Sequence, residues 1–164
     1  MRSNRFSTSS RLWLAGLIAA ASGSAFAADE TTTFDVTATV TAACSVSAAD
    51  LAFGNYDRVL GTLGTTTITS NCTLATPYTL SLDFGGAANV SSRVMDGPNS
   101  ETLSYQLTQD VAGLIPWGTV ADGDEVSLLG TGLDIPTVVY GQIPSGQNVE
   151  AGSYSDTITV TLTY

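Results

Sequence analysis

Apolar and polar residues alternate in several short stretches of this chain, with a period of two residues. A period of two places every second side chain on one face of a β-strand. The pattern therefore predicts strands with one apolar face each, and weaker strands around Ile68 and around Val138 and Tyr140. The apolar rows are Phe34, Val36, Ala38, Val40, Ala42, Cys44 and Val46; then Tyr78, Leu80, Leu82 and Phe84; then Leu103, Tyr105 and Leu107; and finally Ile158, Val160, Leu162 and Tyr164.

Turn-forming residues separate these rows, and no stretch after residue 27 carries a convincing apolar stripe of helical period. Short strands joined by glycine and proline turns are typical of a β-sandwich. The last row ends on Tyr164, so we expect the terminal strand to be buried along its whole length. The turn signals are Gly85-Gly86, Gly97-Pro98-Asn99, Pro116-Trp117-Gly118, Asp122-Gly123-Asp124 and Pro144-Ser145-Gly146.

The first 27 residues have the features of an export signal. Three arginines precede a short apolar run at residues 12–21, and Ala25-Phe26-Ala27 supplies the small residues at which signal peptidases cut. The run is shorter than the roughly 20 residues that a membrane-spanning helix needs. We therefore expect residues 1–27 to be removed and residues 28–164 to form one domain.

The exported chain is strongly acidic. Residues 28–164 contain fifteen acidic residues, only two arginines (Arg58 and Arg93), and no lysine or histidine, which gives a formal net charge of −13. Binding to nucleic acid depends on lysine and arginine contacts to phosphate. The charge therefore excludes a nucleic-acid partner.

Cys44 and Cys72 are the two cysteines of the chain. Paired cysteines are the rule in exported proteins, so we expect a disulfide, which contributes about 3–4 kcal/mol through the closed loop. A metal site is the other use of cysteine. It is disfavoured because no histidine is present and the two thiols are far apart in sequence.

The sequence offers no catalytic constellation. Without histidine, neither a Ser-His-Asp triad nor a Cys-His pair can form, and no phosphate-binding glycine loop is present. The cluster from Asp122 to Glu125 lacks the spacing of an EF-hand loop and reads better as an acidic turn than as a calcium site. We expect no catalytic residue, no metal and no cofactor, and hence a protein that is not an enzyme.

Several short motifs occur in an order and spacing that together are specific. The chain resembles the spore coat protein U domain family, which includes pilins of the archaic (Csu-type) chaperone–usher pathway, over essentially all of residues 28–164. The motifs are VTAACSV (40–46), LAFGNY (51–56), Cys72-Thr73 followed by Pro77-Tyr78, Arg93-Val94-Met95, LSYQL (103–107), Trp117-Gly118, YGQIP (140–144), Gln147 and GSYSDTITVTLTY (152–164).

The resemblance implies an all-β fold, an incomplete immunoglobulin-like β-sandwich that lacks its last strand. A donor strand from a neighbouring subunit or from a chaperone completes such a sandwich. The donor segment lies at about residues 31–40 and offers Phe34, Val36, Ala38 and Val40 to a neighbour's groove. The alternation runs unbroken to Val46, so the sequence does not mark where a donor ends and the first strand begins.

At the other end of the chain, the resemblance implies that residues 154–164 border the groove and pair with the donated strand. The residues concerned are Tyr154, Ile158, Val160, Leu162 and Tyr164, and basic groups of a periplasmic chaperone would hold the carboxylate of Tyr164. The disulfide between Cys44 and Cys72 matches the family position and ties the first strand to the second. Trp117 and Tyr105 are read as packing residues.

The function implied by the resemblance is that of a structural subunit of a bacterial surface pilus, built by donor-strand exchange and supporting adhesion and biofilm formation. Its partners are identical or related pilin subunits, a periplasmic chaperone and an outer-membrane usher, and its route leads through the periplasm to the cell surface. One alternative is a secreted coat protein that self-associates on spores or cells. Another, less favoured, is a carbohydrate-binding adhesin.

Overall fold

The computed structural model describes residues 27–164, and it is built of β-strands with two single turns of 3-10 helix. The predicted signal peptide lies outside these residues, apart from Ala27. Within residues 27–164 no helix is long and apolar enough to cross a membrane. The elements are β1 (Cys44–Ala48), β2 (Thr62–Cys72), β3 (Pro77–Leu82), β4 (Val94–Asp96), η1 (Pro98–Ser100), β5 (Thr102–Ser104), β6 (Gln106–Thr108), η2 (Val120–Asp122), β7 (Val126–Leu129), β8 (Ile135–Ile143) and β9 (Val160–Thr163).

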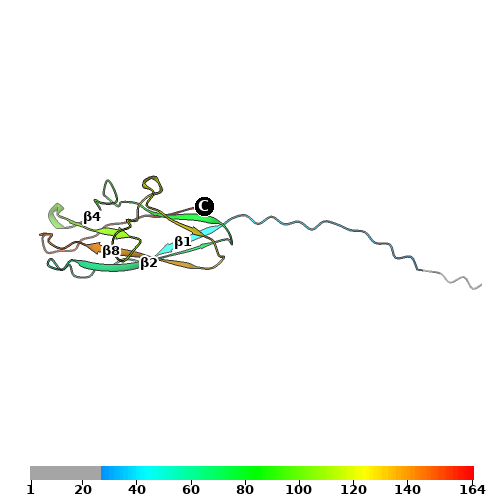
Figure 1. The fold of residues 1–164 in the computed structure, drawn as a ribbon, viewed down its shortest axis with the longest axis horizontal. Helices are drawn as coiled ribbons and strands as arrows, with labels where there is room; N and C mark the ends of the chain where they lie inside the picture. The colour runs from blue at the N-terminus through cyan, green and yellow to red at the C-terminus, as the bar shows by residue number, and fades with distance from the viewer. Residues whose placement is uncertain (1–26) are drawn as a thin grey trace, which may run out of the picture. The chain divides into compact units, whose positions relative to one another are not determined.

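Two antiparallel sheets form the β-sandwich (Figure 1). One sheet has the strand order β1-β2-β8-β6, and the other has the order β7-β3-β9. A short third sheet pairs β4 with β5. Every strand pair in these sheets is antiparallel. The all-β prediction is confirmed.

The core lies between the two sheets and follows the predicted rows closely. Tyr78, Leu80 and Leu82 on β3 are buried, as are Leu103 and Leu107. Trp117 is fully buried, and its indole Nε1 donates to the carbonyl of Leu80 at 3.1 Å. The sequence-based reading of Trp117 as a packing residue is therefore confirmed.

The two strands with the weakest sequence signal are the longest in the structure. β2 has eleven residues and β8 has nine, and they pair over nine positions from Thr62↔Ile143 to Ser70↔Ile135. Their signal is weak because glycines and hydroxyl residues occupy part of the inner face. Gly64 lies directly opposite Gly141 in the register.

The paired glycines make room for an aromatic ring. A Cβ atom at Gly64 would lie 3.2 Å from Phe53, and one at Gly141 would lie 2.8 Å from the same ring. Phe53 packs across this part of the sheet and meets Tyr105 edge-on, with ring centroids 6.2 Å apart. Glycine inside a strand often marks such a close approach.

A disulfide joins β1 to β2. Cys44 and Cys72 are direct partners in the strand register, with Cα atoms 4.1 Å apart, and they are bonded. The chain on either side is held too, because Thr73 N–H donates to the carbonyl of Ala43 at 2.9 Å and Ala43 N–H donates to Thr73 Oγ1 at 3.0 Å. The predicted disulfide and its place between the first two strands are confirmed.

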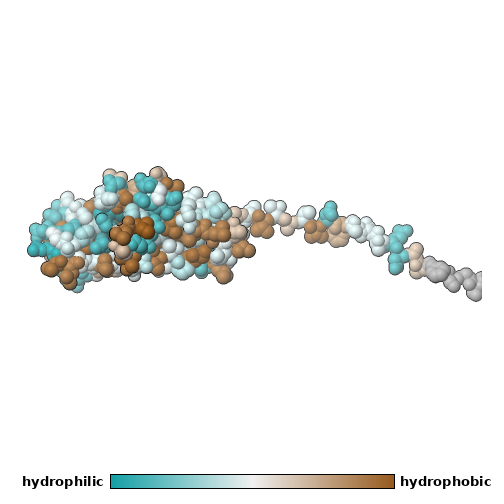
Figure 2. Space-filling model, in the orientation of Figure 1, coloured by the Kyte–Doolittle hydropathy of each residue, from teal (hydrophilic) through white to brown (hydrophobic). Residues whose placement is uncertain are grey.

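Residues 27–43 contain no helix or strand, and their side chains are exposed (Figure 2). Residues 27–38 belong to a separate unit from residues 39–164, and the strands belong to the second. Of the strand expected at residues 34–46, only the part from Cys44 onwards forms. A strand needs a partner for its backbone groups, and residues 34–43 are assigned to no strand pair.

Candidate strand-binding groove

One side of the β-sandwich is closed by the chain itself. The strands β6 and β7 form the sheet edges on this side, and residues 109–125 run between them. Trp117 in this connection fills the core, and Leu82 N–H donates to the carbonyl of Gly118 at 2.9 Å. The amide of Gln109 donates to the carbonyls of Pro116 and Asp124, both at 3.1 Å.

The opposite side is bordered by the edge strands β1 and β9, which approach one another without pairing. Each of these strands has a partner on one side only, β1 on β2 and β9 on β3. A strand edge without a partner presents free N–H and C=O groups that can pair with another strand. A cavity of about 510 Å³, which we call the β1–β9 groove, opens where these strands end. Ala48 of β1 and Val160 of β9 line it, together with the chain segments that follow β1 and precede β9.

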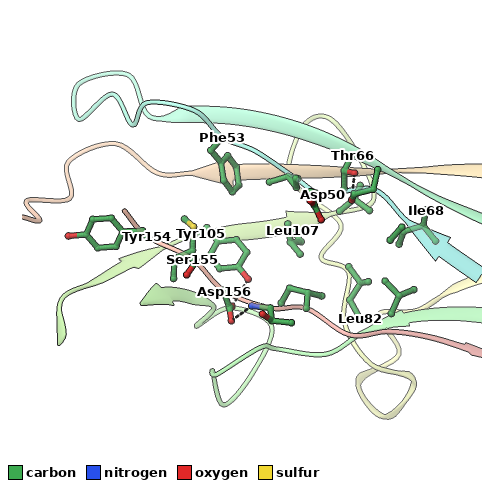
Figure 3. Close-up of a pocket in the computed structure, with 18 residues that line it drawn as sticks. Asp50, Phe53, Thr66, Ile68, Leu82, Tyr105, Leu107, Tyr154, Ser155 and Asp156 are labelled. Atoms are coloured by element: carbon green, nitrogen blue, oxygen red, sulfur yellow. Dashed lines mark hydrogen bonds between the residues drawn. The ribbon is translucent and has the colours of Figure 1, made fainter. Parts of the chain in front are cut away.

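Apolar and polar side chains together line the groove (Figure 3). Core residues from both sheets form its floor, so that part of the hydrophobic core is accessible to solvent. The apolar lining residues are Ala48, Ala49, Leu51, Phe53, Ile68, Leu82, Met95, Leu107, Val139, Ile158 and Val160, and the polar ones are Asp50, Thr66, Tyr105, Tyr154, Ser155, Asp156 and Thr157.

The terminal residues border this groove and are only partly covered. Ile158, Val160 and Leu162 are half-buried, while Tyr164 is 62% exposed. The expectation that this row is buried along its whole length is wrong for the isolated chain, because no strand lies beyond β9. On the other edge, Val46 of β1 is likewise 37% exposed.

The terminal strand is also shorter than the sequence pattern predicts. β9 covers Val160–Thr163, and before it Ser155 forms an isolated bridge with Asp96. Between these points Asp83 N–H donates to the carbonyl of Thr159 at 3.1 Å, and Asp83 Oδ1 accepts from Thr159 N–H at 2.8 Å and from Gly85 N–H at 3.1 Å. The segment is thus held by a backbone bond and by bonds to the side chain of Asp83.

These bonds shift the acidity of Asp83. Burial raises its pKa, but the hydrogen bonds from Thr159 and Gly85, together with the charge of Arg93, outweigh burial and hold the pKa below its ordinary value. Asp83 is therefore ionised in the folded chain at neutral pH.

A polar cluster closes the end of the groove near Tyr154. Tyr105 is buried, and its hydroxyl donates to Asp156 Oδ2 at 2.7 Å. Burial, and then this hydrogen bond, raise the pKa of Tyr105, so the phenol stays neutral. Asp156 Oδ1 accepts from Thr157 N–H at 2.7 Å, which orients the carboxylate at the groove wall.

Arg93 lies beneath this cluster and is fully buried. Its Nη2 donates to the carbonyls of Asp83 at 2.6 Å and Trp117 at 2.8 Å, and its guanidinium lies 5.7 Å from the ring centre of Phe84. Desolvation lowers the pKa of Arg93, and Tyr105 and Asp83 counter that effect. With Arg93 buried, Arg58 is the one exposed arginine among residues 27–164.

The predicted donor residues are exposed in the first part of the described chain. Phe34 and Val36 are each 84% exposed, Val40 is 82% exposed, and Ala38 is exposed as well. Across residues 27–164 no three histidine, cysteine, aspartate or glutamate side chains are grouped to hold a metal ion.

Of the residues that line the groove, Tyr154, Ile158 and Val160 are among those named from the sequence, while much of the floor is not. Asp50, Phe53 and Thr66 lie in or beside segments with no clear alternation, and Asp156 reads only as a polar residue between strand positions. The signal that could have found Phe53 is the pair of glycines in β2 and β8, since isolated strand glycines mark close approach of another group.

Comparison with known proteins agrees with this architecture. The Spore Coat Protein U domain matches residues 30–161. "Protein U" of Myxococcus xanthus is 38% identical over 173 residues, an alignment that covers 92% of this chain and 96% of that protein.

A solved structure has the same fold. It is the CsuC–CsuE chaperone–tip adhesion subunit pre-assembly complex from archaic chaperone–usher Csu pili of Acinetobacter baumannii, matched with a TM-score of 0.58 and 23% identity. The match covers 77% of this chain and 41% of the solved chain. The fold is thus the incomplete immunoglobulin-like β-sandwich, and this chain belongs to the Spore Coat Protein U domain family.

Proposed function

We propose that this protein is a structural, non-catalytic subunit of a bacterial surface pilus, assembled by donor-strand exchange. The observation that carries the proposal is the β1–β9 groove, which exposes core side chains beside two strands, β1 and β9, that each have a partner on one side only. Adding a strand there would pair both sets of free backbone groups and cover half-buried core side chains. The same chain carries an exposed alternating segment of the kind that such a groove accepts.

The proposed donor, residues 31–40, is long enough to run beside the strands of the acceptor. Ten extended residues span about 33 Å, close to the length of the eleven-residue β2 that runs beside the groove. Its inward row would be Phe34, Val36, Ala38 and Val40. Each large apolar side chain contributes about 1.5–3 kcal/mol when buried, and alanine less, so the joint would dissociate very slowly.

A periplasmic chaperone would occupy the groove first, and an outer-membrane usher would direct its replacement by the next subunit's donor. The Csu complex of Acinetobacter baumannii, a chaperone with a pilus subunit, supports the first partner through the shared fold. Residues Tyr154, Ile158, Val160 and Leu162 would set the register of the occupying strand. The C-terminal carboxylate of Tyr164, a residue that is 62% exposed, would be free for basic groups of the chaperone.

The finished fibre would lie on the cell surface after passage through the periplasm, and we place adhesion and biofilm formation among its roles. The acidic surface of the exported chain is consistent with a protein that stays soluble in the periplasm before it is assembled.

Deletion of the proposed donor tests the proposal directly. The exported chain and a variant lacking residues 28–39 are refolded with the disulfide intact and compared on unboiled SDS gels and by size exclusion. We expect an SDS-resistant ladder from the intact chain, its loss on deletion, and binding of a 31–40 peptide to the deleted variant. A peptide with Phe34→Asp and Val36→Asp is the matched control and should not bind. Stable monomers of both chains, with no peptide binding, would show that the sandwich is complete as it stands.

A self-associating coat protein is the second candidate, and the spore coat description of the family favours it. It shares strand donation with the pilus proposal but needs no dedicated assembly machinery. Chaperone and usher genes beside the gene for this chain would support the pilus, and their absence would favour the coat.

A further inference from the structure

Two apolar surface features lie at opposite ends of the β-sandwich, and the proposed function leaves both unused. At the end that carries the disulfide, Leu74 is 72% exposed, Leu129 57% and Leu133 70%. We call these three residues the leucine cap. At the other end, where β2 begins, Val59 is 81% exposed and Leu60 is 83% exposed.

The leucine cap is held together by backbone hydrogen bonds. Ala75 N–H donates to the carbonyl of Gly130 at 2.8 Å, Gly130 N–H donates to Thr76, and Gly132 N–H donates to Cys72 at 3.0 Å. Thr73, in the neighbouring turn, is hydrogen-bonded to Ala43, just before β1 begins. The cap therefore surrounds the point from which the N-terminal segment departs.

Val59 and Leu60 form an equally rigid turn. The carboxylate of Asp57 accepts from Val59 N–H at 2.7 Å and from Leu60 N–H at 3.0 Å, and Gly61 N–H donates to the carbonyl of Asp57 at 2.8 Å. These bonds hold both apolar side chains outward. The neighbouring loops at this end, residues 97–101 and 144–150, contribute no exposed large apolar side chain.

The following inference rests on the proposed function, because it starts from a donor bound in a neighbour's groove. A donor that ends at Val40 is followed by β1 at Cys44, and the three residues between them allow a span of at most about 14 Å. A ten-residue donor is nearly as long as the eleven-residue β2, so the body that supplies it must lie against one end of the acceptor. The leucine cap of that body then faces the acceptor directly.

The choice of end decides the kind of assembly. If the cap faced the cap of the acceptor, each chain could donate to the other and the contact would close on itself as a two-fold dimer. If the cap faces the opposite end, the contact is head-to-tail and repeats without closing. A fibre requires the second arrangement.

We propose that the leucine cap of one subunit packs on the Val59–Leu60 turn of a second copy of this chain, at each joint of the fibre. Both surfaces are apolar and preorganised, and each lies at the end of the sandwich that a head-to-tail joint brings together. The contact would fix the angle between successive subunits, which a three-residue connection alone leaves free.

Thiol cross-linking tests this contact in the assembled protein. Exported chains carrying Leu60→Cys and Leu133→Cys singly are mixed, assembled and treated with a short bismaleimide, which reacts with free thiols and leaves the Cys44–Cys72 disulfide intact. We expect a covalent dimer that survives boiling and reductant, formed between a residue-133 peptide and a residue-60 peptide. A mixture of Leu60→Cys with Leu114→Cys is the matched control, since Leu114 is 79% exposed but lies outside the cap.

The possible results separate the inference from the function on which it rests. A cross-link between two Leu133→Cys chains, in a sample without Leu60→Cys, would show that two leucine caps face one another. That result would overturn the head-to-tail joint. An SDS-resistant ladder with no cross-link beyond the Leu114→Cys control would overturn the contact while leaving donor-strand assembly in place. Absence of the ladder from the unmodified chain would contradict both the proposed contact and donor-strand assembly.

Discussion

At the scale of single residues, the position of Phe53 in the groove depends on the glycine at residue 141. A Cβ atom there would lie 2.8 Å from Phe53 Cζ and 3.0 Å from Leu51 Cδ1. Both of those side chains line the groove, so a methyl group in the strand would push them into the space that a donor needs.

We therefore predict that Gly141→Ala destabilises the chain by about 1–3 kcal/mol, the usual cost of overpacking, and also weakens peptide binding to the groove. Urea unfolding and titration of the 31–40 peptide measure the two effects. Gly86→Ala is the control, because a Cβ atom at Gly86 meets nothing within 4 Å. Unchanged peptide affinity in Gly141→Ala would mean that Phe53 does not shape the occupied groove.

Asp83 gives the chain a defined response to acid. Because its pKa is depressed in the folded state, ionised Asp83 stabilises the fold above its unfolded pKa of about 3.8, and this contribution is lost as the pH falls through the lower folded value. We predict that Asp83→Asn lowers stability at pH 7 by less than about 1 kcal/mol, because the carboxylate is largely solvent-screened and Asn keeps an acceptor oxygen, and flattens the loss of stability below pH 4. Urea unfolding from pH 2 to pH 7 measures both, and parallel curves for the two proteins would contradict the assignment.

At the scale of elements, β9 is the strand on which an occupant of the groove would depend. Val160 lines the groove, while the next residue, Thr161, is exposed on the other face of the strand. We predict that Val160→Asn abolishes the SDS-resistant ladder with only a small change in far-UV circular dichroism, because the side chain is already half-buried. Thr161→Asn should assemble as the parent chain does. Equal assembly by both variants would show that β9 does not border the bound strand.

The elements also show how far sequence patterns reach. Alternation located β3 and the row Leu103, Tyr105, Leu107, yet the structure divides that row between β5 and β6 in different sheets. Tyr105 lies at the crossing. Alternation with a period of two predicts which face of a strand is buried, but not which strand pairs with it. The change of sheet at Tyr105 was therefore not predictable from the alternation.

The groove was predictable only in part for a related reason. The absence of a last strand was predicted from the family resemblance and not from the alternation. A row such as Ile158, Val160 and Leu162 has the same pattern whether the strand that covers it belongs to the same chain or to another molecule. Conversely, β2 and β8 gave little signal, since Gly64, Thr66 and Gly141 on their inner face make room for side chains that arrive from elsewhere. Such long-range fitting is visible only in the folded chain.

At the scale of the whole molecule, charge opposes association. The exported chain carries −13, and of its two arginines one is buried. Like-charged copies repel one another, and salt screens the repulsion, with a Debye length of about 30 Å at 0.01 M and about 8 Å at 0.15 M.

We predict that spontaneous ladder formation by the purified chain is at least about tenfold slower in 10 mM salt than in 150 mM salt. Gel densitometry over time measures the rates. Sodium chloride and sodium fluoride should act alike if screening is the cause. Equal rates at both ionic strengths would show that the strand exchange itself, and not encounter between subunits, limits assembly.

The bond between Cys44 and Cys72 has a mechanical consequence for such a fibre. Tension that arrives through the N-terminal segment enters the body at Cys44, and the disulfide passes it straight to the end of β2. β2 is paired on both sides, with β1 and with β8. A pull along its axis therefore loads many hydrogen bonds at once in shear, whereas a pull on β1 alone would peel an edge strand away one bond after another.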